Sequence, residues 1–499
     1  MSLASPPTHQ FKSYIGGEWH DPGEGSRSVP NLNPATGETL GEVLLASRED
    51  TRRAIELAHE AFEQWRAVPS PKRGDYLFRV VRLLEARREE LARALTMEEG
   101  KVITEARGEV QKAINAVEFA AGEGRRLGGH TVDSELPNNF CYTMRQPLGV
   151  VGIITPWNFP VAIPLWKMAP CLVCGNTIVF KPATNTPWTA CLMMEVLHEA
   201  GLPPGVVNMV LGPGSAVGDE IVTNPKIRAI SFTGSTGVGM DINRRGAERG
   251  IKIQCEMGGK NPIIVMEDAD LDLAVEATVQ GAFGSTGQRC TATSRAIVVD
   301  EVADSFVEKL VARARKLVVG NGLNAHSDLG PSVDQSQLET VLEYIEIGKK
   351  EGCKLLLGGH RLQDAEHSSG FFVEPTIFDQ VTPTHRLALE EIFGPVLSVI
   401  RVKDFDQAIE VANSVEFGLS SSLYTRDINR VFRYLDRIET GITHINSPTM
   451  GGEAHMPFGG LKNTGLGGRE QGREAIEFYT EIKSVYIDYT GEKRTSKVY

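Results

Sequence analysis

Long apolar runs, clusters of basic residues and a dense set of cysteines are all missing from this sequence. No stretch approaches the roughly 20 apolar residues that a membrane-spanning helix needs, so we expect no membrane partner. The formal net charge is −12, with no Lys/Arg-rich run or zinc-finger spacing, so we expect no nucleic-acid partner. The first residues have neither a basic and apolar signal segment nor the Arg-rich character of a transit peptide, so we expect a cytoplasmic protein.

Cysteines are few and odd in number. The seven cysteines are spread along 499 residues, which does not suit a disulfide framework, so we expect reduced thiols. Cys171 and Cys174 form a CxxC pair, but they lie in an apolar segment with no second Cys or His pair nearby. We interpret them as part of a helix core rather than as a metal or redox site.

The length exceeds the size at which a single core stops growing, so two large domains are expected. Apolar residues at helical spacing over 51–66, 72–97 and 108–127 predict that the N-terminal region begins with helices. From Leu148 onward, short Val- and Ile-rich runs alternate with helix-like stretches, one of which ends at Gly201. This alternation predicts a parallel sheet covered by helices on both faces.

A second alternating series follows in the C-terminal half. It includes a long helix-like stretch at 303–320 and strand-like runs at 395–402 and 418–425, and it predicts a second α/β domain. Two β-prone segments, 129–147 and 481–493, lie outside both series and cannot form a stable sheet alone. We expect them to pair with each other and with another subunit.

Cys290 is a candidate nucleophile. It lies in FGSTGQRCTATSR (283–295), after a helix-like run and before a strand. Glycines and small residues just before the thiol leave the backbone accessible, as an attacking sulfur requires. The loop is also compatible with a buried, inert thiol, and the residues around Cys290 do not by themselves decide between the two.

Two polar residues follow strand-like runs at positions suited to catalysis. Glu256 stands in CEMGGKNP, where a strand ends in a Gly-Gly turn, and a carboxylate at such a crevice edge can act as a general base. An exposed strand-end glutamate is the alternative. Asn158 stands in TPWNFP, between two prolines that stiffen the turn, where its amide can stabilise an oxyanion or merely cap its own turn.

Three segments are candidates for binding a cofactor. FTGSTGVG (232–239) and LGPGSAVG (211–218) both have a strand, a Gly-rich turn and a helix in order, which lets a phosphate approach a helix N-terminus. Neither fits the G-x-G-x-x-G pattern. Lys181 and Thr184 follow another strand end, where a lysine can reach a ribose hydroxyl or a phosphate, or can simply be solvated.

Together these segments resemble the aldehyde dehydrogenase superfamily over nearly the whole chain. The family's FxxxGQxC and ELGGK signatures are matched by Phe283, Gly287, Gln288 and Cys290 and by EMGGK at 256–260, and PWNFP (156–160), EEIFGPV (390–396) and PFGGLKNTG (457–465) match further family segments. The separation of Glu256 and Cys290, 290 − 256 = 34 residues, is that expected of hydrolytic members.

The resemblance implies an α/β fold with a Rossmann-like cofactor domain, an α/β catalytic domain and a small β excursion for oligomerisation. Its segments would be 1–128 and 148–255 for the dinucleotide-binding domain, 256–447 for the catalytic domain, and 129–147 and 480–499 for the oligomerisation strands. A homo-oligomer, dimer or tetramer, is implied as well.

The resemblance also implies a mechanism. The Cys290 thiolate attacks the aldehyde, and the oxyanion is held by the Asn158 side chain and the backbone N–H of Cys290. Hydride transfer to nicotinamide leaves a thioester, which a water activated by Glu256 hydrolyses. Lys167 assists the exit of the proton, and no metal is required.

For the cofactor, NAD or NADP, the resemblance implies residues along the whole crevice. Glu391 and Phe393 hold the nicotinamide ribose and ring. The adenosine and pyrophosphate contacts are Ile154, Trp157, Lys181, Gly214, Gly218, Gly234 and Ser235. Thr184 stands where many NAD-preferring members have a glutamate that would repel a 2′-phosphate, so NADP should at least be tolerated.

Arg289 directly precedes the nucleophile, and Arg occupies this position in relatives that oxidise phosphorylated or carboxylated aldehydes. A guanidinium there can bind a carboxylate with two hydrogen bonds and lower the thiol pKa, whereas the alternative is a structural ion pair. Lys112 is a second candidate cation. The wall of the substrate tunnel would be formed by Phe159, Ala162, Ile163 and Trp166.

Within the family, the segments GQRCTATSR, INSPTMGGEAHMPFGG and SVYIDYTG are most similar to members that oxidise 2-oxoglutarate semialdehyde. The substrate expected is therefore a small carboxylate-bearing aldehyde, with succinate semialdehyde or a broad range of aldehydes as alternatives. A coenzyme A-acylating member would need no general base, so Glu256 argues against it. Intact Cys290, Asn158 and Glu256 argue against a purely structural protein.

Overall fold

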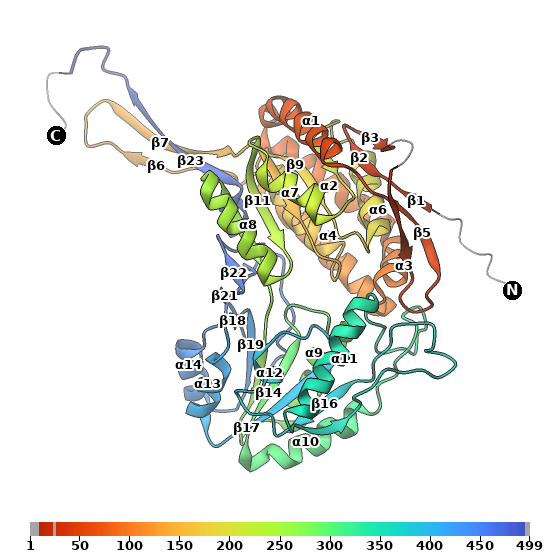
Figure 1. The fold of residues 1–499 in the computed structure, drawn as a ribbon. Helices are drawn as coiled ribbons and strands as arrows, with labels where there is room; N and C mark the ends of the chain where they lie inside the picture. The colour runs from red at the N-terminus through yellow and green to blue at the C-terminus, as the bar shows by residue number, and fades with distance from the viewer. Residues whose placement is uncertain (1–8, 23–25, 495–499) are drawn as a thin grey trace.

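Two large β-sheets flanked by helices organise the part of the chain that the computed structural model describes, residues 9–22 and 26–494. In Figure 1 one sheet with its helices lies above the other, and a long β-arm extends sideways from the upper one. Parallel strands alternating with helices make up most of both sheets, so the predicted α/β fold class is confirmed.

The first sheet has eight strands in the order β22-β12-β11-β8-β9-β10-β2-β3. Its central strands are parallel and rich in Val and Ile, and side chains buried on both faces are the reason that these short apolar runs form strands. The bounds are β2 (Ser13–Ile15), β3 (Glu18–His20), β8 (Val150–Ile154), β9 (Thr177–Lys181), β10 (Val207–Met209), β11 (Ile227–Thr233), β12 (Lys252–Glu256) and β22 (Gly465–Leu466).

The register of this sheet places several predicted site residues along one edge. Ile154 pairs with Lys181 on one side and with Phe232 on the other, and Thr233 pairs with Glu256. Because the strands are parallel, their carboxyl ends lie together, where ligands bind in open α/β sheets.

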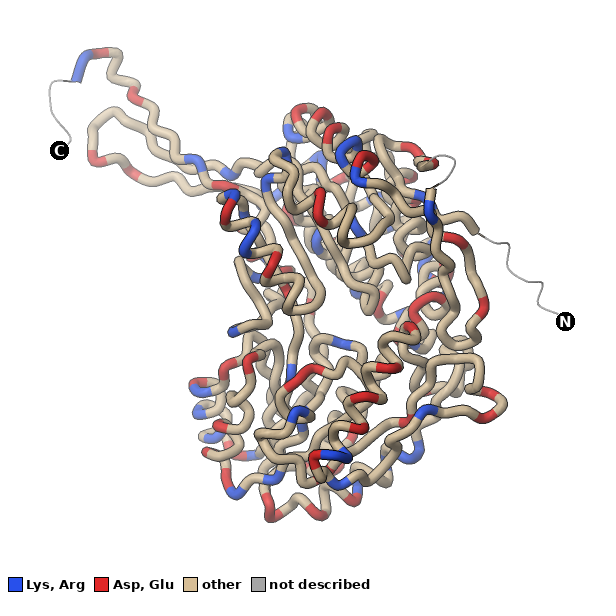
Figure 2. The backbone as a smooth tube through the Cα atoms, in the orientation of Figure 1, with Lys and Arg blue, Asp and Glu red and all other residues tan. Residues whose placement is uncertain are grey.

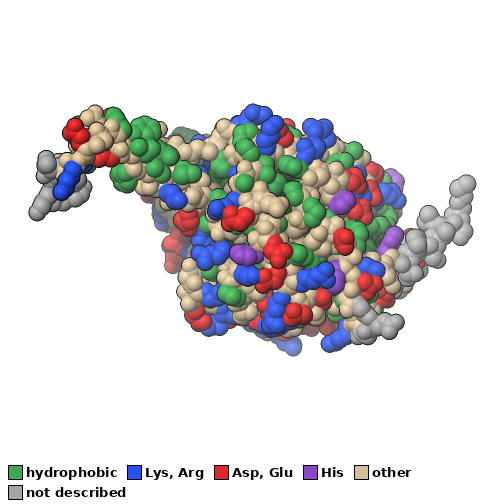
Figure 3. Space-filling model, turned by 90° about the horizontal axis from the view of Figure 1, so that it is seen from above, with side chains coloured by type: hydrophobic (Ala, Val, Ile, Leu, Met, Phe, Trp, Pro, Cys, Tyr) green, Lys and Arg blue, Asp and Glu red, His purple; other side chains and the backbone are tan. Residues whose placement is uncertain are grey.

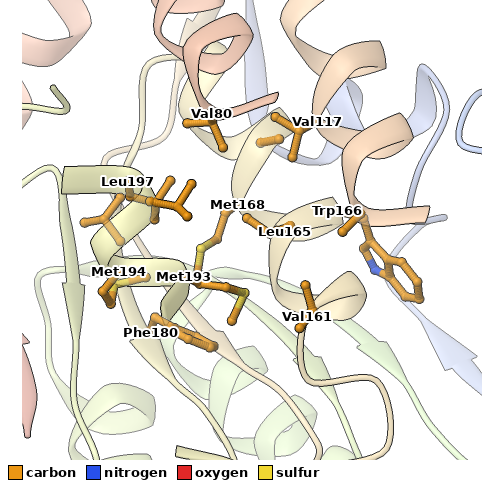
Figure 4. Close-up of a cluster of buried hydrophobic side chains, with 14 of the residues drawn as sticks. Val80, Val117, Val161, Leu165, Trp166, Met168, Phe180, Met193, Met194 and Leu197 are labelled. Atoms are coloured by element: carbon orange, nitrogen blue, oxygen red, sulfur yellow. The ribbon is translucent and has the colours of Figure 1, made fainter. Parts of the chain in front are cut away.

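Helices cover both faces of the first sheet. Figure 4 shows Val80, Val117, Leu165 and Met193, from four different helices, packed together beside Phe180 of β9. These side chains are buried, and each contributes about 1.5–3 kcal/mol relative to an exposed position. The helices are α1 (Arg48–Ala67), α2 (Ser70–Ala86), α3 (Arg88–Glu99), α4 (Ile103–Glu123), α5 (Ala162–Val173), α6 (Pro187–Glu199), α7 (Asp219–Thr223) and α8 (Thr236–Arg249).

The prediction that the N-terminal region begins with helices is wrong. Strands β1 (His9–Phe11), β2, β3, β4 (Ser28–Leu32) and β5 (Thr39–Leu44) precede α1. They are too short to leave a clear two-residue alternation in the sequence. They are held instead by pairing with other segments, such as Tyr14 of β2 with Met209 of β10.

Two helix predictions were too long. The stretch 72–97 divides at Arg87 (φ −101°, ψ 14°), where α2 ends and α3 begins. The stretch 303–320 ends at Ala314, and Val319 forms an isolated bridge with Leu329. In each stretch, apolar residues continue at helical spacing beyond the end of the first helix. They do so because the residues before and after that point pack into one hydrophobic core.

The second sheet has seven strands in the order β15-β16-β17-β14-β13-β19-β20, all parallel except β15. The strand-like runs predicted at 395–402 and 418–425 are confirmed as β17 and as β18 with β19. The strands are β13 (Asn261–Val265), β14 (Thr293–Val299), β15 (Lys354–Leu357), β16 (Thr376–Asp379), β17 (Val396–Val402), β19 (Ser420–Tyr424) and β20 (Ile442–Ile445). The short β18 (Phe417–Gly418) pairs with β21 (Leu461–Lys462) in a separate two-stranded sheet. The helices are α9 (Leu271–Phe283), α10 (Asp300–Ala314), α11 (Gln335–Lys350), α12 (Arg386–Leu389), α13 (Phe405–Asn413) and α14 (Ile428–Arg437).

Three antiparallel strands form the arm in Figure 1: β6 (Thr131–Asp133), β7 (Asn139–Pro147) and β23 (Thr480–Asp488). The short α15 (Glu474–Phe478) directly precedes β23. β23 pairs with β7 along its whole length. The predicted pairing of the two β-prone segments with each other is therefore confirmed.

All seven cysteines are free, and Cys171 and Cys174 are buried in α5 and at its C-terminus, as the helix-core interpretation predicted. Within residues 9–22 and 26–494, no helix combines the length and the apolar character that crossing a membrane requires. Figure 2 shows acidic and basic residues interspersed over the outer helices of both sheets.

Candidate active site

The loop that carries Cys290 has an unusual backbone. Between α9 and β14, the short η2 (Gly284–Gly287) contains Ser285 (φ 48°) and Thr286 (φ 58°), two non-glycine residues in the left-handed region. Such conformations are strained and persist only where surrounding contacts enforce them. Gly287 also has a positive φ, and an added Cβ there would lie 2.2 Å from the carbonyl oxygen of Gly394.

Cys290 itself is partly exposed, but its thiol lies in a desolvated setting. Burial and, to a smaller extent, the carboxyl groups of Glu391 and Glu256 raise the pKa of the Cys290 thiol to about 12, although Lys112 lowers it. Without a ligand, Cys290 is therefore a protonated thiol at neutral pH. A nearby cation or the loss of a carboxylate charge favours the reactive thiolate.

Asn158 lies against the Cys290 loop. Its side chain is 3% exposed, its Nδ2 donates to the backbone carbonyl of Gln288 at 3.0 Å, and its Oδ1 has no hydrogen-bond partner among the described residues. The amide of Asn158 is thus fixed in a buried place against Gln288, which lies two residues before the nucleophile in the chain. Redirected to an oxyanion formed at Cys290, it would stabilise the developing charge.

Glu256 ends β12 and is 2% exposed. Its carboxyl group lies against the backbone of Gly459, where an added Cβ would be 2.3 Å from Oε1, and it has no side-chain partner among the described residues. Burial and Glu470 raise the pKa of Glu256 well above its ordinary value, whereas Lys167 and Arg469 lower it. A carboxyl group with a raised pKa is suited to accepting a proton from water near neutral pH.

Lys167 of α5 lies in a buried polar cluster beside Glu256. Its Nζ pairs with Glu470 and donates to Ser231 Oγ at 2.9 Å, and Trp166 Nε1 donates to the second Glu470 oxygen at 2.7 Å. The sequence prediction found Lys167 but missed Glu470. The signal for Glu470 was a charged residue in the Gly-rich segment that follows the PFGGLKNTG motif.

The predicted adenosine side of the crevice follows the first sheet. Lys181 ends β9, and its buried Nζ contacts only the carbonyl of Pro182, at 3.2 Å, among the described residues. Burial lowers the pKa of Lys181 to about 8. Thr184 lies nearby, with its hydroxyl 3.5 Å from the carbonyl of Gly212. An unpaired buried cation of this kind fits a ribose or phosphate ligand.

Two Gly-rich turns lie on the same side. The turn Gly214–Gly218 forms a single π-helical turn, and an added Cβ on Gly218 would be 3.8 Å from Lys181 Cδ. Gly234 precedes Ser235, which begins α8 without any side-chain cap, so backbone N–H groups at this helix end are free for a phosphate.

The predicted nicotinamide side is formed from the second sheet. Phe393 has a positive φ (59°), and its ring meets Trp157 edge-on, with centroids 5.4 Å apart. Glu391 Oε1 accepts the backbone N–H of Gly259 at 2.8 Å, and burial raises the pKa of Glu391 to about 7. With Ile154, Lys181 and Ser235 across the crevice, these residues fit a nicotinamide dinucleotide.

An open cavity of about 730 Å³ lies along α4, between that helix and the segment 452–455. Its lining includes Arg88, Gln111, Lys112, Arg126 and His455. Burial lowers the pKa of Lys112, Cys290 raises it and Arg289 lowers it, so Lys112 lies within electrostatic reach of the nucleophile. The lining also includes Glu118 and Glu453, so three Lys or Arg side chains face two carboxylates, a small excess that favours an acidic substrate.

Lys112 and Arg289 differ in how their charges are balanced. Lys112 lies over the rings of Trp166 (5.2 Å) and Phe458 (5.8 Å) and forms no ion pair with any described residue. Arg289 pairs with Glu105 at 2.9 Å. The structure therefore shows Arg289 in the ion pair that was the alternative to a carboxylate grip.

The four residues predicted to line a substrate tunnel differ in their surroundings. Phe159 and Trp166 lie near the two cations, since Arg289 is 5.7 Å above the Phe159 ring. Ala162 (0% exposed), Ile163 (1%) and Trp166 (6%) belong to the hydrophobic core of the first sheet, and Phe159 packs against it. Their place on the wall of a substrate tunnel stays a prediction.

Comparison with known proteins gives one consistent result. A model of the aldehyde dehydrogenase family matches residues 19–485. The alpha-ketoglutaric semialdehyde dehydrogenase of Bacillus subtilis is 45% identical over 478 residues, 96% of this chain and 98% of its own length. Malonate-semialdehyde dehydrogenase 3 of Geobacillus kaustophilus is 42% identical over 483 residues, covering 97% and 99%.

Solved structures agree. Betaine aldehyde dehydrogenase from Staphylococcus aureus, solved in complex with NAD+, has a TM-score of 0.94 and 33% identity, and the match covers 97% of this chain and 95% of that one. The family match, the relatives and the geometry around Cys290 lead to the same conclusion: the chain belongs to the aldehyde dehydrogenase family.

Proposed function

We propose that this aldehyde dehydrogenase oxidises a carboxylate-bearing semialdehyde, in the first place 2-oxoglutarate semialdehyde, to the corresponding dicarboxylic acid with NAD+ or NADP+. The observation that carries the proposal is Lys112, a desolvated ammonium that lines an open cavity, forms no ion pair with a described residue and lies within electrostatic reach of Cys290. A substrate carboxylate would supply the missing anion. The semialdehyde-oxidising relatives support the same substrate class.

The residues of the chain divide the chemistry between them. The Cys290 thiol first gives up its proton, for which Glu256 is a nearby base, and the thiolate Sγ attacks the aldehyde carbon. The oxygen gains the charge, which Asn158 Nδ2 and the backbone N–H of Cys290 stabilise. The proton must leave Glu256 before Glu256 can act on water. A nicotinamide dinucleotide held by residues such as Lys181, Ser235 and Glu391 would accept the hydride. Loss of the hydride leaves the acyl group on Cys290 as a thioester.

Glu256 then removes a proton from water, which attacks the thioester and frees the acid. Its raised pKa makes it a competent base, and its lack of a side-chain partner leaves it room to meet the water. Lys167, in the buried cluster with Glu470, provides a route by which the accepted proton can leave the interior.

Substitution of Lys112 by methionine tests the substrate class. A hydrogen bond to a charged group contributes about 1.5–3 kcal/mol, so Lys112→Met should raise KM for 2-oxoglutarate and succinate semialdehydes about tenfold to a hundredfold. Oxidation of hexanal should slow only about twofold to fivefold, because loss of Lys112 raises the pKa of Cys290. Lys309→Met, on the outer face of α10, is the matched control. An equal effect on hexanal would contradict the proposal.

Arg289 stays a second candidate for the substrate carboxylate. It would have to leave Glu105, its partner in the structure, to bind a ligand. If Arg289→Gln raises KM for acidic aldehydes but not for hexanal, Arg289 leaves Glu105 and binds the substrate carboxylate. If it lowers kcat equally for all aldehydes, Arg289 serves the loop rather than the substrate.

Two other functions can be separated by direct assays. A coenzyme A-acylating enzyme would form a thioester product only with coenzyme A present, whereas the proposed enzyme forms the free acid without it. A protein without turnover would give no reduced nicotinamide with any aldehyde. Cys290→Ala should abolish activity, and retained activity in that variant would exclude Cys290 as the nucleophile.

A homo-oligomer, dimer or tetramer, is proposed from the β-arm. Figure 3 shows hydrophobic side chains gathered on this arm, which extends away from the body. Val132, Phe140, Ile482 and Tyr486 are all at least 46% exposed there, and β23 leaves one edge unpaired within its sheet. Tyr486→Asp combined with Ile482→Lys should reduce the mass measured by light scattering to that of one chain.

A cytoplasmic location is proposed on chemical grounds. All seven cysteines are free, and the proposed nucleophile works only as a reduced thiol. Fractionation of the native source, with activity followed in each fraction, would test the location.

A further inference from the structure

One helix that no sequence motif marks, α4, holds both loops of the proposed catalytic centre. Glu105 and Glu109 lie four residues apart on α4, so they project from one face of the helix. Each contacts a different loop. Lys112, one turn further on, continues this face toward the cavity.

Glu105 binds the loop that carries the nucleophile. The backbone N–H of Ser285 donates to both carboxylate oxygens, at 2.9 and 3.0 Å, and the Ser285 hydroxyl donates at 3.1 Å. Arg289 Nη2 donates to the same carboxylate at 2.9 Å, and Arg289 Nε donates to Ser285 Oγ at 2.9 Å. Glu105 therefore supplies contacts that hold the left-handed Ser285 in place, whereas the Thr286 hydroxyl donates to the carbonyl of Gly330 at 3.0 Å.

Glu109 binds the loop that carries the oxyanion donor. Its Oε1 accepts the backbone N–H groups of Val161 and Ala162, at 2.9 and 3.1 Å, at the start of α5. Its Oε2 accepts from Lys101 Nζ at 2.7 Å, and that ammonium also donates to the backbone carbonyl of Asn158 at 2.6 Å. Lys101 and Glu109 are both fully buried, so this support is rigid.

The two loops are also joined directly, because Asn158 Nδ2 donates to the carbonyl of Gln288. The contacts thus form a closed ring that runs from α4 through Glu105 to the cysteine loop, across to Asn158, and back through Lys101 and Glu109. A ring of this kind fixes the distance between an attacking sulfur and its oxyanion donor. Displacement of a reacting group by about 1 Å can cost a hundredfold in rate.

We propose that Glu105 and Glu109 are positioning residues that set Asn158 against Cys290 for attack on the aldehyde. The inference rests on the proposed roles of Cys290 and Asn158. It predicts that Glu109 acts through Asn158, and that neither carboxylate contributes to cofactor binding.

The test is a double-mutant cycle between Glu109→Gln and Asn158→Ala. The amide keeps the size of the side chain but places a second donor among the donors of Lys101, Val161 and Ala162. The measurement is single-turnover formation of reduced nicotinamide with enzyme in excess, together with the cofactor dissociation constant. Glu85→Gln, on the exposed side of α2, is the matched control.

Glu109→Gln should slow the single turnover about tenfold or more with cofactor affinity unchanged. In the Asn158→Ala background the same change should have an effect of about twofold or less, because the donor it positions is gone. Additive effects, or slower turnover in Glu85→Gln, would overturn the inference. If the parent chain itself gives no turnover, the proposed function fails instead.

Glu105→Gln keeps the inference testable if Glu109→Gln does not fold, since the Glu105 side chain is partly exposed. It should slow single turnover about tenfold and change the rate at which iodoacetamide alkylates Cys290. Asn158→Ala should slow turnover without altering alkylation. An unchanged alkylation rate in a folded Glu105→Gln protein would overturn the positioning role of Glu105.

Discussion

The two sides of Cys290 are built from different parts of the chain. On the side of α4, charged side chains provide the support, with Glu105 and Glu109 each bound to a catalytic loop. On the side of the first sheet, the predicted cofactor crevice is formed mostly by backbone turns, such as Gly214–Gly218, and by the uncapped start of α8.

This difference determines which substitutions are informative. A support made of side chains is weakened by removing a group, so isosteric changes test it. A crevice made of backbone is affected by adding a group, because glycine and threonine leave the space that a ligand needs.

Glu256→Gln should have the largest effect, because it removes the proposed base where the two sides meet. Steady-state turnover should fall about a hundredfold to ten-thousandfold, while one equivalent of reduced nicotinamide still forms in a rapid burst. Stopped-flow absorbance measures both phases. A variant without a burst would place Glu256 before hydride transfer and not after it.

Asn158→Ala should slow the formation of the thioester about a hundredfold to a thousandfold, as loss of one oxyanion donor does elsewhere. Single-turnover rates report this step. Cofactor affinity should not change, because Asn158 belongs to the α4 side. A weaker affinity for NAD+ in this variant would show that the α4 side also contributes to cofactor binding.

Thr184→Glu adds a carboxylate to the crevice. It should raise KM for NADP+ about tenfold and leave KM for NAD+ unchanged or lower, because the charge repels a 2′-phosphate. Thr184→Gln, of the same length without the charge, is the control. If Thr184→Gln raises KM for NADP+ over KM for NAD+ to the same extent, the effect is due to the size of the side chain. The charge at residue 184 then does not determine the choice between the two cofactors.

The smallest effect concerns the thiol itself. With a pKa raised to about 12, the thiolate fraction of Cys290 should rise about tenfold per pH unit through neutral pH. Lys112 lowers that pKa, so its removal raises the pKa, and Lys112→Met should alkylate about twofold to fivefold more slowly. Iodoacetamide kinetics across pH measure both. A rate that levels off near neutral pH would show that the thiol is already ionised.

The sequence placed the two polar residues at strand ends together. Asn158 follows β8 and Glu256 ends β12, and parallel strands bring their carboxyl ends to one edge. Cys290 lies between α9 and β14, and it was singled out by its motif. The alternating pattern from Leu148 onward likewise predicted the fold class. The limits of the two domains stay a prediction, and β22, from the segment after residue 447, lies in the first sheet.

The residues that the sequence did not reveal are those whose partners lie far along the chain. Glu105 and Glu109 have the spacing of acids on a solvated helix face, and nothing local shows that they bind segments near residues 285 and 161. Arg289 was weighed as a carboxylate grip for the same reason, since Glu105 lies 184 residues away. The N-terminal strands were missed for another reason: β1, β2 and β3 have three residues each, too few for a pattern, although most of their partners are close in the chain.

The position of β22 has a consequence for how the chain folds as it is made. Its two residues, Gly465–Leu466, pair with β12 at one end of the first sheet, so that edge stays open while all of the second sheet is being synthesised. An unpaired edge strand invites pairing with other chains, and contacts of such sequence separation form slowly. The nascent protein must therefore keep the unpaired edge of β12 from pairing with other chains until the segment that contains β22 emerges from the ribosome.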